Sequence, residues 1–365
     1  MYALLRPLLF SLPPDVAHSA GMAALAPIEH LAPLRALVRA LFARPDASLR
    51  RRVMGLDFPS PLGVAAGFDK NALRARALSA LGFGHVEIGT VTALAQEGNP
   101  RPSLFRLPKD RALINRLGFP NEGAQRVAAR IAARGGARAM GVPLGVSIGK
   151  SRAVPLSSEH GDPLRPAIDD YLASFRAVRD VADFVVVNVS SPNTKDLRAM
   201  QGAVIARALL SALAREASLP SASPFASKQA PPLLVKIAPD LDDAALEALL
   251  AVVAEVGIAG VVATNTTIAR AGLSTDASAV AAIGAGGLSG APLRARALAV
   301  VARVRARLGG GVAVIGVGGV ERAEHAQALL DAGADLVQMY TGFIYQGPLC
   351  AWSIARGLAR ARNAP

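Results

Sequence analysis

The chain of 365 residues has a single cysteine, Cys350, and aromatic side chains make up only 4% of it. One cysteine excludes an internal disulfide framework and any zinc site built on cysteines, and it fits a reducing cytosol. The five histidines have no metal-ligand spacing, and they stand at positions 18, 30, 85, 160 and 325. We therefore predict no metal site.

Long hydrophobic runs are missing as well, although hydrophobic residues make up 52% of the chain. No run approaches the ~20 apolar residues that a membrane-spanning helix needs. The segment Leu8–Leu12 comes nearest to a signal-peptide core, but Ser11 interrupts it and Pro13-Pro14 follow. Because no convincing cleavage site of small residues follows, we expect the mature protein to begin at Met1.

The charge is mainly of one sign, with a formal net charge of +13 at pH 7. Such an excess indicates an anionic partner: a nucleic acid, a membrane surface or a phosphate-bearing ligand. Nucleic acid fits worst, because aromatics are scarce, zinc-finger spacing is missing and the arginines are scattered instead of forming a block. A genomic bias toward Arg and Ala explains the excess equally well.

The first 45 residues differ from the rest and predict two short amphipathic helices. Asp15, after Pro13-Pro14, is placed to cap a helix that runs to about Ala26. A second helix over residues 28–42 has an apolar stripe formed by Leu31, Leu34, Leu37, Val38 and Leu41, with Arg35 and Arg39 on its polar side. Such helices lie in a membrane interface or pack as a hairpin on the main domain, and the pattern leaves both open.

From Val53 onward, apolar β-branched runs alternate with Ala/Leu/Arg-rich stretches of helical period. The predicted strands cover residues 62–68, 85–91, 144–149, 184–190, 233–238, 260–266, 312–320 and 336–342. Eight strand–helix units predict an α/β fold, a (β/α)8 TIM barrel over residues 46–365 with a helical extension over 1–45; a doubly wound sheet is the alternative. Residues 92–120 fall outside the pattern and are long enough to cover the barrel mouth as a lid.

Polar residues and glycines follow the predicted strands at their C-terminal ends, where an α/β barrel places its binding site. The run Phe184–Val187 turns directly into Asn188-Val-Ser-Ser-Pro-Asn-Thr194. Lys236 lies between apolar neighbours at an inward position of the fifth strand, where a cation needs an anion or a carbonyl. Glycine-rich turns at Gly286–Gly290, Gly316–Gly319 and Tyr340–Gly342 are typical of a phosphate grip.

The chemistry that the sequence lacks also narrows the function. No pair of carboxylates is placed for glycosidase-type work, and no histidine stands at a strand mouth. A bound cofactor held by Asn, Thr, Ser and Lys is then the source of the difficult chemistry. A Schiff base on Lys236 in a phosphate-binding aldolase barrel is the alternative.

These residues closely resemble the quinone-dependent, membrane-associated class of dihydroorotate dehydrogenase, over almost the whole chain. The resemblance is carried by the motifs Ala65–Lys70, Glu87–Thr92, Ile114–Phe119, Asn188–Thr194, Val235–Asp240, Ala263–Thr267, Gly286–Gly290 and Ile315–Gly319. It implies an FMN-containing barrel that oxidises (S)-dihydroorotate to orotate in de novo pyrimidine synthesis. It further implies that the electrons pass to a membrane quinone, ubiquinone or menaquinone.

The resemblance implies a role for individual residues. Ser191 would be the base that removes the C5 proton, where the soluble classes carry a cysteine. The implied flavin contacts are Ala66, Gly67, Phe68, Asp69, Lys70, Thr90, Ser147, Asn188, Lys236, Thr264, Gly290, Gly319, Tyr340 and Thr341. Ser147 replaces an asparagine of many members and is kept only as a weak contact. The implied substrate contacts are Lys70, Asn115, Arg116, Leu117, Gly118, Phe119, Asn188, Asn193, Asn265 and Thr266.

In the family, the N-terminal helices form a tunnel by which the quinone reaches the flavin. His18, Arg106 and Tyr340 match residues near that tunnel, although His18 suits a structural role equally. The resemblance implies a monomer attached peripherally to the cytoplasmic face of the cell (inner) membrane, with no nucleic-acid and no obligate protein partner. One alternative function is that of a soluble dihydroorotate oxidase using fumarate or NAD, but Ser191 and the N-terminal extension argue against it. A second and weaker alternative is a non-catalytic barrel whose N-terminal helices bind a partner.

Overall fold

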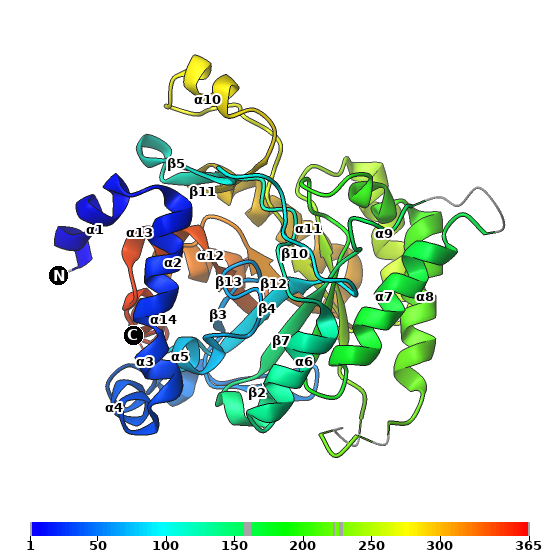
Figure 1. The fold of residues 1–365 in the computed structure, drawn as a ribbon, viewed down its shortest axis with the longest axis horizontal. Helices are drawn as coiled ribbons and strands as arrows, with labels where there is room; N and C mark the ends of the chain where they lie inside the picture. Colours follow the sequence, from blue (N-terminus) through cyan, green and yellow to red (C-terminus); the bar gives the residue numbers. More distant parts are fainter. Residues whose placement is uncertain (1, 157–161, 222, 226–228, 364–365) are drawn as a thin grey trace.

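The computed structural model describes residues 2–156, 162–221, 223–225 and 229–363, so His160 lies outside the described residues. The eight predicted strands close into one parallel barrel (Figure 1). In barrel order they are β3 (Leu62–Val64), β4 (His85–Val91), β7 (Leu144–Ile148), β8 (Phe184–Asn188), β9 (Leu233–Ile237), β10 (Gly260–Ala263), β12 (Ala313–Val317) and β13 (Leu336–Met339). Since β13 pairs back to β3, the (β/α)8 barrel is confirmed and the doubly wound sheet is excluded.

The barrel interior has an apolar lower half, because side chains alternate along each strand. Inward residues of five barrel strands pack with Phe58 of a hairpin, β1 (Arg51–Val53) and β2 (Leu56–Phe58), which closes the N-terminal end. These inward residues are Phe184, Val186, Leu234, Val262, Ile315 and Leu336. One step higher, the same alternation brings Asn188 and Lys236 to the C-terminal end, where the site lies.

Helices surround the barrel and bury their apolar faces against it. They are α5 (Ala75–Ala80), α6 (Ala124–Ala133), α7 (Arg165–Val178), α8 (Ala203–Ser218), α9 (Asp243–Val256), α11 (Arg294–Leu308), α12 (Ala323–Asp331) and α14 (Cys350–Asn363), with the additional α10 (Ala277–Ile283) and α13 (Thr341–Gln346). Short 3-10 turns are η1 (Ala47–Leu49), η2 (Pro108–Asp110), η3 (Ala137–Met140), η4 (Leu197–Gln201), η5 (Ala291–Leu293) and η6 (Gly309–Gly311). Helix α5 begins only at Ala75, because the Asp69 carboxylate accepts hydrogen bonds from the Leu73 and Arg74 amides and holds the preceding segment as a loop.

The long excursion after β4 covers the barrel mouth, as predicted. It forms β5 (Leu104–Leu107) and β6 (Ala112–Asn115), which pair with β11 (Gly287–Gly290) in an antiparallel sheet, here called the lid sheet (Figure 1). The expectation of a glycine-rich turn at Gly286–Gly290 is therefore wrong for most of its length. Its residues take a strand conformation because the ladder with Ala112–Asn115 satisfies their backbone groups.

The N-terminal extension contains α1 (Tyr2–Ser11), α2 (Pro14–Ala24), α3 (Ala26–His30) and α4 (Ala32–Phe42), which lie along one side of the barrel (Figure 1). Helix α1 was not predicted. The single helix expected over 28–42 is interrupted at Leu31, because Pro33 has no N–H for the Glu29 carbonyl. The Arg35 guanidinium donates to that carbonyl instead, at 2.7 Å. No helix in the described part of the chain has the length and apolarity to span a bilayer.

Asp15 does not cap α2, contrary to expectation, since the N-cap position is Pro13 and makes no side-chain cap bond. Its carboxylate instead accepts a hydrogen bond from the Ser103 hydroxyl at 3.0 Å, which ties α2 to the lid segment. Glu29 of α3 is buried, and its carboxylate lies 3.1 Å from the Arg134 guanidinium and accepts from the Ala77 amide. These contacts join the extension to the barrel; its description as a separate domain ending at residue 45 stays a prediction.

Candidate active site

A cavity at the C-terminal end of the barrel, beneath the lid sheet, gathers residues from all of the sequence motifs. Of the residues expected to contact flavin or substrate, those that line it are Ala66, Gly67, Lys70, Thr90, Asn115, Leu117, Gly118, Phe119, Asn188, Asn193, Lys236, Thr264, Asn265, Thr266, Gly290, Gly319, Tyr340 and Thr341. Ser191 lines it too. The barrel therefore brings together segments that lie more than 250 residues apart in the chain.

Four predicted contacts are not among the described residues that line the cavity. Asp69 is buried and binds backbone amides, and burial raises the pKa of its carboxyl while the Arg74 and Leu73 amides oppose the rise. Ser147 is fully buried and bonds the Thr90 hydroxyl at 2.9 Å. Phe68 packs on Phe343 at 4.7 Å between ring centroids. The Arg116 guanidinium stacks on Phe105.

A connected set of amides and hydroxyls forms one wall of the cavity. The Asn188 amide donates to the Thr90 hydroxyl at 3.0 Å, and the Asn265 amide donates to Ser190 Oγ at 2.9 Å and to Asn188 Oδ1 at 3.3 Å. The Tyr171 hydroxyl, fully buried, holds the end of β8 by donating to the Asn188 carbonyl at 2.8 Å. This wall presents fixed donors and acceptors to a ligand, and such a set suits a ring of alternating carbonyl and N–H groups.

Ser191 stands beside this wall and is 5% exposed. Its Oγ accepts a hydrogen bond from the Asn193 backbone N–H at 3.2 Å. The Asn193 side-chain amide donates to Asn115 Oδ1 at 2.9 Å, which joins the Ser191 loop to the lid sheet. An N–H directed at Oγ stabilises negative charge there, as a hydroxyl that exchanges protons requires.

Lys236 finds its anion in Glu87, which the sequence interpretation had given no role. Its Nζ lies 3.4 Å from Glu87 Oε1, and the Gln338 amide donates to Glu87 Oε2 at 2.7 Å. The three side chains come from the inner faces of β9, β4 and β13, and those of Lys236 and Glu87 are 6% and 0% exposed. The signal that could have revealed Glu87 was a carboxylate within a predicted barrel strand, since a buried carboxylate needs a cation or a donor as its partner.

Glycines and hydroxyls form the opposite end of the cavity. Gly290 and Gly319 have φ of +100° and +68°, in the region that L side chains rarely adopt, and a Cβ on Gly319 would lie 2.6 Å from the Arg294 Cβ. The Ser289 and Thr341 hydroxyls bond each other at 2.8 Å beside them. This close backbone with two hydroxyls fits a phosphate group.

A second hollow lies against the first and shares Lys70 and Tyr340 with it. It also contains His18 of α2, whose ring meets that of Phe68 edge-on at 5.4 Å. Burial lowers the pKa of His18 to about 4 and raises that of Tyr340 to about 12, so both are neutral near pH 7. Arg106 is not among the described residues of either hollow; its guanidinium donates to the Leu9 carbonyl at 3.0 Å and lies over Phe10.

Comparison with known proteins decides the family. The sequence model of dihydroorotate dehydrogenase matches residues 48–361. The chain belongs to the dihydroorotate dehydrogenase family. This membership confirms the resemblance noted from the sequence motifs.

Individual members of the family match nearly the full chain. The dihydroorotate dehydrogenase (quinone) of Thermobifida fusca is 49% identical over 346 residues, which cover 94% of this chain and 87% of the relative. That of Clavibacter michiganensis is 50% identical over 367 residues, covering 100% and 99%. Among solved structures, DHODH of Eimeria tenella in complex with ferulenol has a TM-score of 0.84 at 34% identity, covering 98% of this chain and 95% of that one.

Proposed function

We propose that the protein oxidises (S)-dihydroorotate to orotate in pyrimidine synthesis, with FMN as its flavin and a membrane quinone as the final acceptor. The relatives that carry the name dihydroorotate dehydrogenase (quinone) support this reaction. The observation that carries it is a hydroxyl, that of Ser191, set at a cavity walled by four asparagine side chains. They are Asn115, Asn188, Asn193 and Asn265.

The substrate is held by groups that match its chemistry. Its ring offers alternating carbonyl and N–H groups to the asparagine amides, each of which both donates and accepts. Its carboxylate meets Lys70, a cation that lines the cavity. Ser191 Oγ takes the C5 proton while its own proton passes to solvent water, and the Asn193 N–H stabilises the oxygen during the exchange.

The residues present fit FMN. The backbone at Gly290 and Gly319, with the Ser289 and Thr341 hydroxyls, would hold its single phosphate, and Lys236 would face its ring. When bound, FMN supplies the two-electron acceptor for the hydride from C6 of the substrate. Glu87 and Gln338 hold Lys236 at its place on the cavity floor.

An anaerobic titration tests the function. Purified protein should have the yellow absorbance of a bound flavin, and stoichiometric dihydroorotate should bleach it. Acid release then yields FMN on chromatography. A colourless protein, or a flavin that dihydroorotate leaves oxidised, would overturn the proposal, and a product trapped on Lys236 by borohydride would favour the aldolase alternative.

Lys70 gives the substrate affinity a pH dependence. Burial lowers the pKa of Lys70 to about 8, against the opposing effect of Asp69 and Asp15. Below this pKa the ammonium attracts a carboxylate; as pH rises through 8 the charge and its attraction are lost. We expect the Kd of orotate to rise by up to about tenfold per pH unit above 8. In Lys70→Arg, whose charge persists, the Kd measured by flavin absorbance should stay level between pH 7 and 9.5.

The extension supports peripheral membrane attachment as part of the same proposal. Eight of the fourteen large exposed hydrophobic side chains in the described part of the chain belong to the extension: Leu4, Leu5, Leu8, Leu12, Val16, Leu31, Leu37 and Leu41. A hollow between α4 and α14 adds Arg44, Arg356 and Arg360 beside Trp352, which suits anionic headgroups. We propose that the protein binds as a monomer to the cytoplasmic face of the cell membrane, with His18, Arg106 and Tyr340 near the quinone path.

A further inference from the structure

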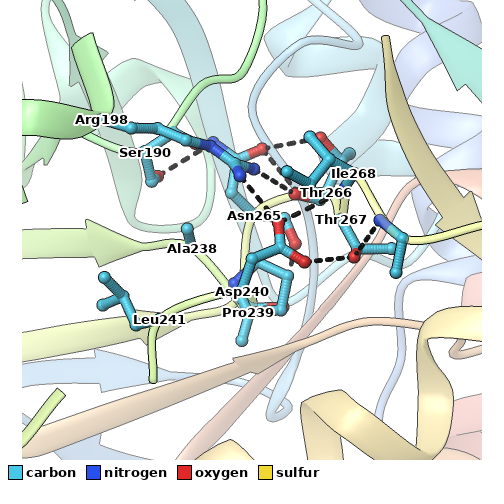
Figure 2. A network of polar contacts seen from close by, with 12 residues as sticks. Ser190, Arg198, Ala238, Pro239, Asp240, Leu241, Asn265, Thr266, Thr267 and Ile268 are labelled. Atoms are coloured by element: carbon cyan, nitrogen blue, oxygen red, sulfur yellow. Dashed lines mark hydrogen bonds and ion pairs between the residues drawn. The ribbon is translucent and has the colours of Figure 1, made fainter. Parts of the chain in front are cut away.

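One guanidinium joins three loops at the rim of the barrel mouth. Arg198, in η4, donates through Nε to the Ser190 carbonyl at 3.1 Å, through one Nη to Asp240 Oδ2 at 2.8 Å and through the other to the Thr266 carbonyl at 3.0 Å (Figure 2). These partners follow β8, β9 and β10 in turn. A planar guanidinium presents N–H groups from three separate nitrogens in fixed directions, whereas the three N–H groups of a lysine all leave a single nitrogen.

Asp240 completes the junction from the loop after β9. Its Oδ2 accepts from Arg198 and from the Ile268 amide at 3.1 Å, and its Oδ1 accepts from the Thr267 hydroxyl (Figure 2). Thr267 in turn pairs through its backbone with Leu288 of the lid sheet. The side chains of the pair are partly covered, with exposures of 23% for Arg198 and 20% for Asp240, although Asp240 taken with its backbone is an exposed residue. Because the side chains are partly covered, the geometry of this ion pair contributes more to the position of its loops than that of a fully exposed pair would.

The loops so joined carry the groups that meet the substrate. Ser190 precedes the base Ser191 directly, and its Oγ accepts from the Asn265 amide at 2.9 Å. Asn265 and Thr266 line the same cavity as Ser191. Arg198 and Asp240 are not among the described residues that line the cavity. The junction therefore joins two loops that line the cavity without lining it itself.

We propose that Arg198 and Asp240 are positioning residues that set the distance between the Ser191 hydroxyl and the Asn265–Thr266 loop. This inference rests on the proposed function, because it assigns the pair to proton removal from dihydroorotate. The fold has separate anchors for the same segment: the Gln201 side chain accepts from the Ala238 amide at 2.8 Å, and Arg296 donates to the Pro239 and Leu241 carbonyls. Loss of the junction thus loosens the alignment and leaves the β9 loop attached.

The test compares Arg198→Lys and Asp240→Asn with wild-type holoenzyme. We expect each variant to keep its FMN, to reduce the flavin about 10 to 100 times more slowly at saturating dihydroorotate, and to bind orotate more weakly. The double variant should lose little more than the worse single variant, since both break one junction. Thr267→Val, which removes only the hydroxyl donor to Asp240, should show a smaller loss of the same kind.

A matched ion pair provides the control. Arg207 on α8 and Glu255 on α9 bond at 2.8 Å near the same barrel units but on the exposed surface. Arg207→Lys and Glu255→Gln should leave both the reduction rate and orotate binding unchanged. If the junction variants lowered only the melting temperature, with wild-type reduction rates and orotate affinity, the pair would be structural and the inference wrong. If wild-type protein itself failed to reduce flavin with dihydroorotate, the proposed function would fail instead.

Discussion

Ser191→Ala should retain its flavin and slow dihydroorotate-driven flavin reduction by a factor of about 10² to 10⁴, the range that a positioned general base supplies. The hydroxyl is 5% exposed, and the change removes one oxygen from a loop that Arg198, Asn193 and Tyr171 hold through other atoms. The binding of orotate should therefore change little. Stopped-flow absorbance of the flavin under anaerobic conditions measures the rate, and orotate titration measures the affinity.

Ser191→Cys separates the chemistry of the base from the shape of the loop. A thiol loses its proton more readily than a hydroxyl, so this variant should recover part of the rate and show a pH profile that follows the thiol. Near-normal reduction by Ser191→Ala would remove the residue from the role of base. Cys350 does not complicate the experiment, because it is buried and burial raises the pKa of its thiol to about 12.

Replacement of the exposed leucines of α1 should uncouple the enzyme from membranes. Leu4, Leu5 and Leu8 are 84%, 52% and 66% exposed. If the interface buries even half of each side chain, the three together contribute ~3 kcal/mol, so the triple Ser variant should partition about 100-fold less onto vesicles. Turnover with a long-chain quinone in vesicles should fall with it, while anaerobic reduction of the flavin by dihydroorotate stays at the wild-type rate.

The control for this variant lies on α8, on the other side of the barrel (Figure 1). Val204 on α8 and Leu219, directly after its last residue, are 76% and 53% exposed, and their replacement by serine should not alter vesicle binding. Equal loss in both variants would argue against a membrane face on the extension. Deletion of residues 1–45 is a poorer test, because it would also remove the buried Glu29 and leave Arg134 without its carboxylate.

The barrel was predictable because its strands are β-branched runs buried on both faces, as Phe184–Asn188 shows. The break at Leu31 has a local signal, since Pro33 lacks the N–H that the Glu29 carbonyl would need. The start of α5 has none, because it depends on the side chain of Asp69 turning back to accept from the Leu73 and Arg74 amides. The lid sheet was missed as a sheet because β6 and β11 are far apart in sequence, and pairing at that separation leaves no local pattern.

The order of the strands was enough to predict those site residues that directly follow a barrel strand. Position at a C-terminal strand end brought Asn188, Ser191 and Asn265 together. The roles of Glu87 and of the Arg198–Asp240 junction were not predicted. Their ion-pair partners lie on other strands or loops, and the sequence alone does not show which of these are adjacent. Arg106 was expected near the quinone path, and the structure places its side chain against α1; its role there stays a prediction.

The lid sheet has a consequence for how long the cofactor stays bound. The β1–β2 hairpin and the apolar lower half of the barrel close the opposite end. We therefore expect a flavin beneath the lid sheet to leave most readily when the register of β6 against β11, from Ala112↔Gly290 to Asn115↔Gly287, is broken locally. Cofactor residence time is then a measure of local unfolding, and it should track hydrogen exchange at the β6–β11 amides more closely than global stability.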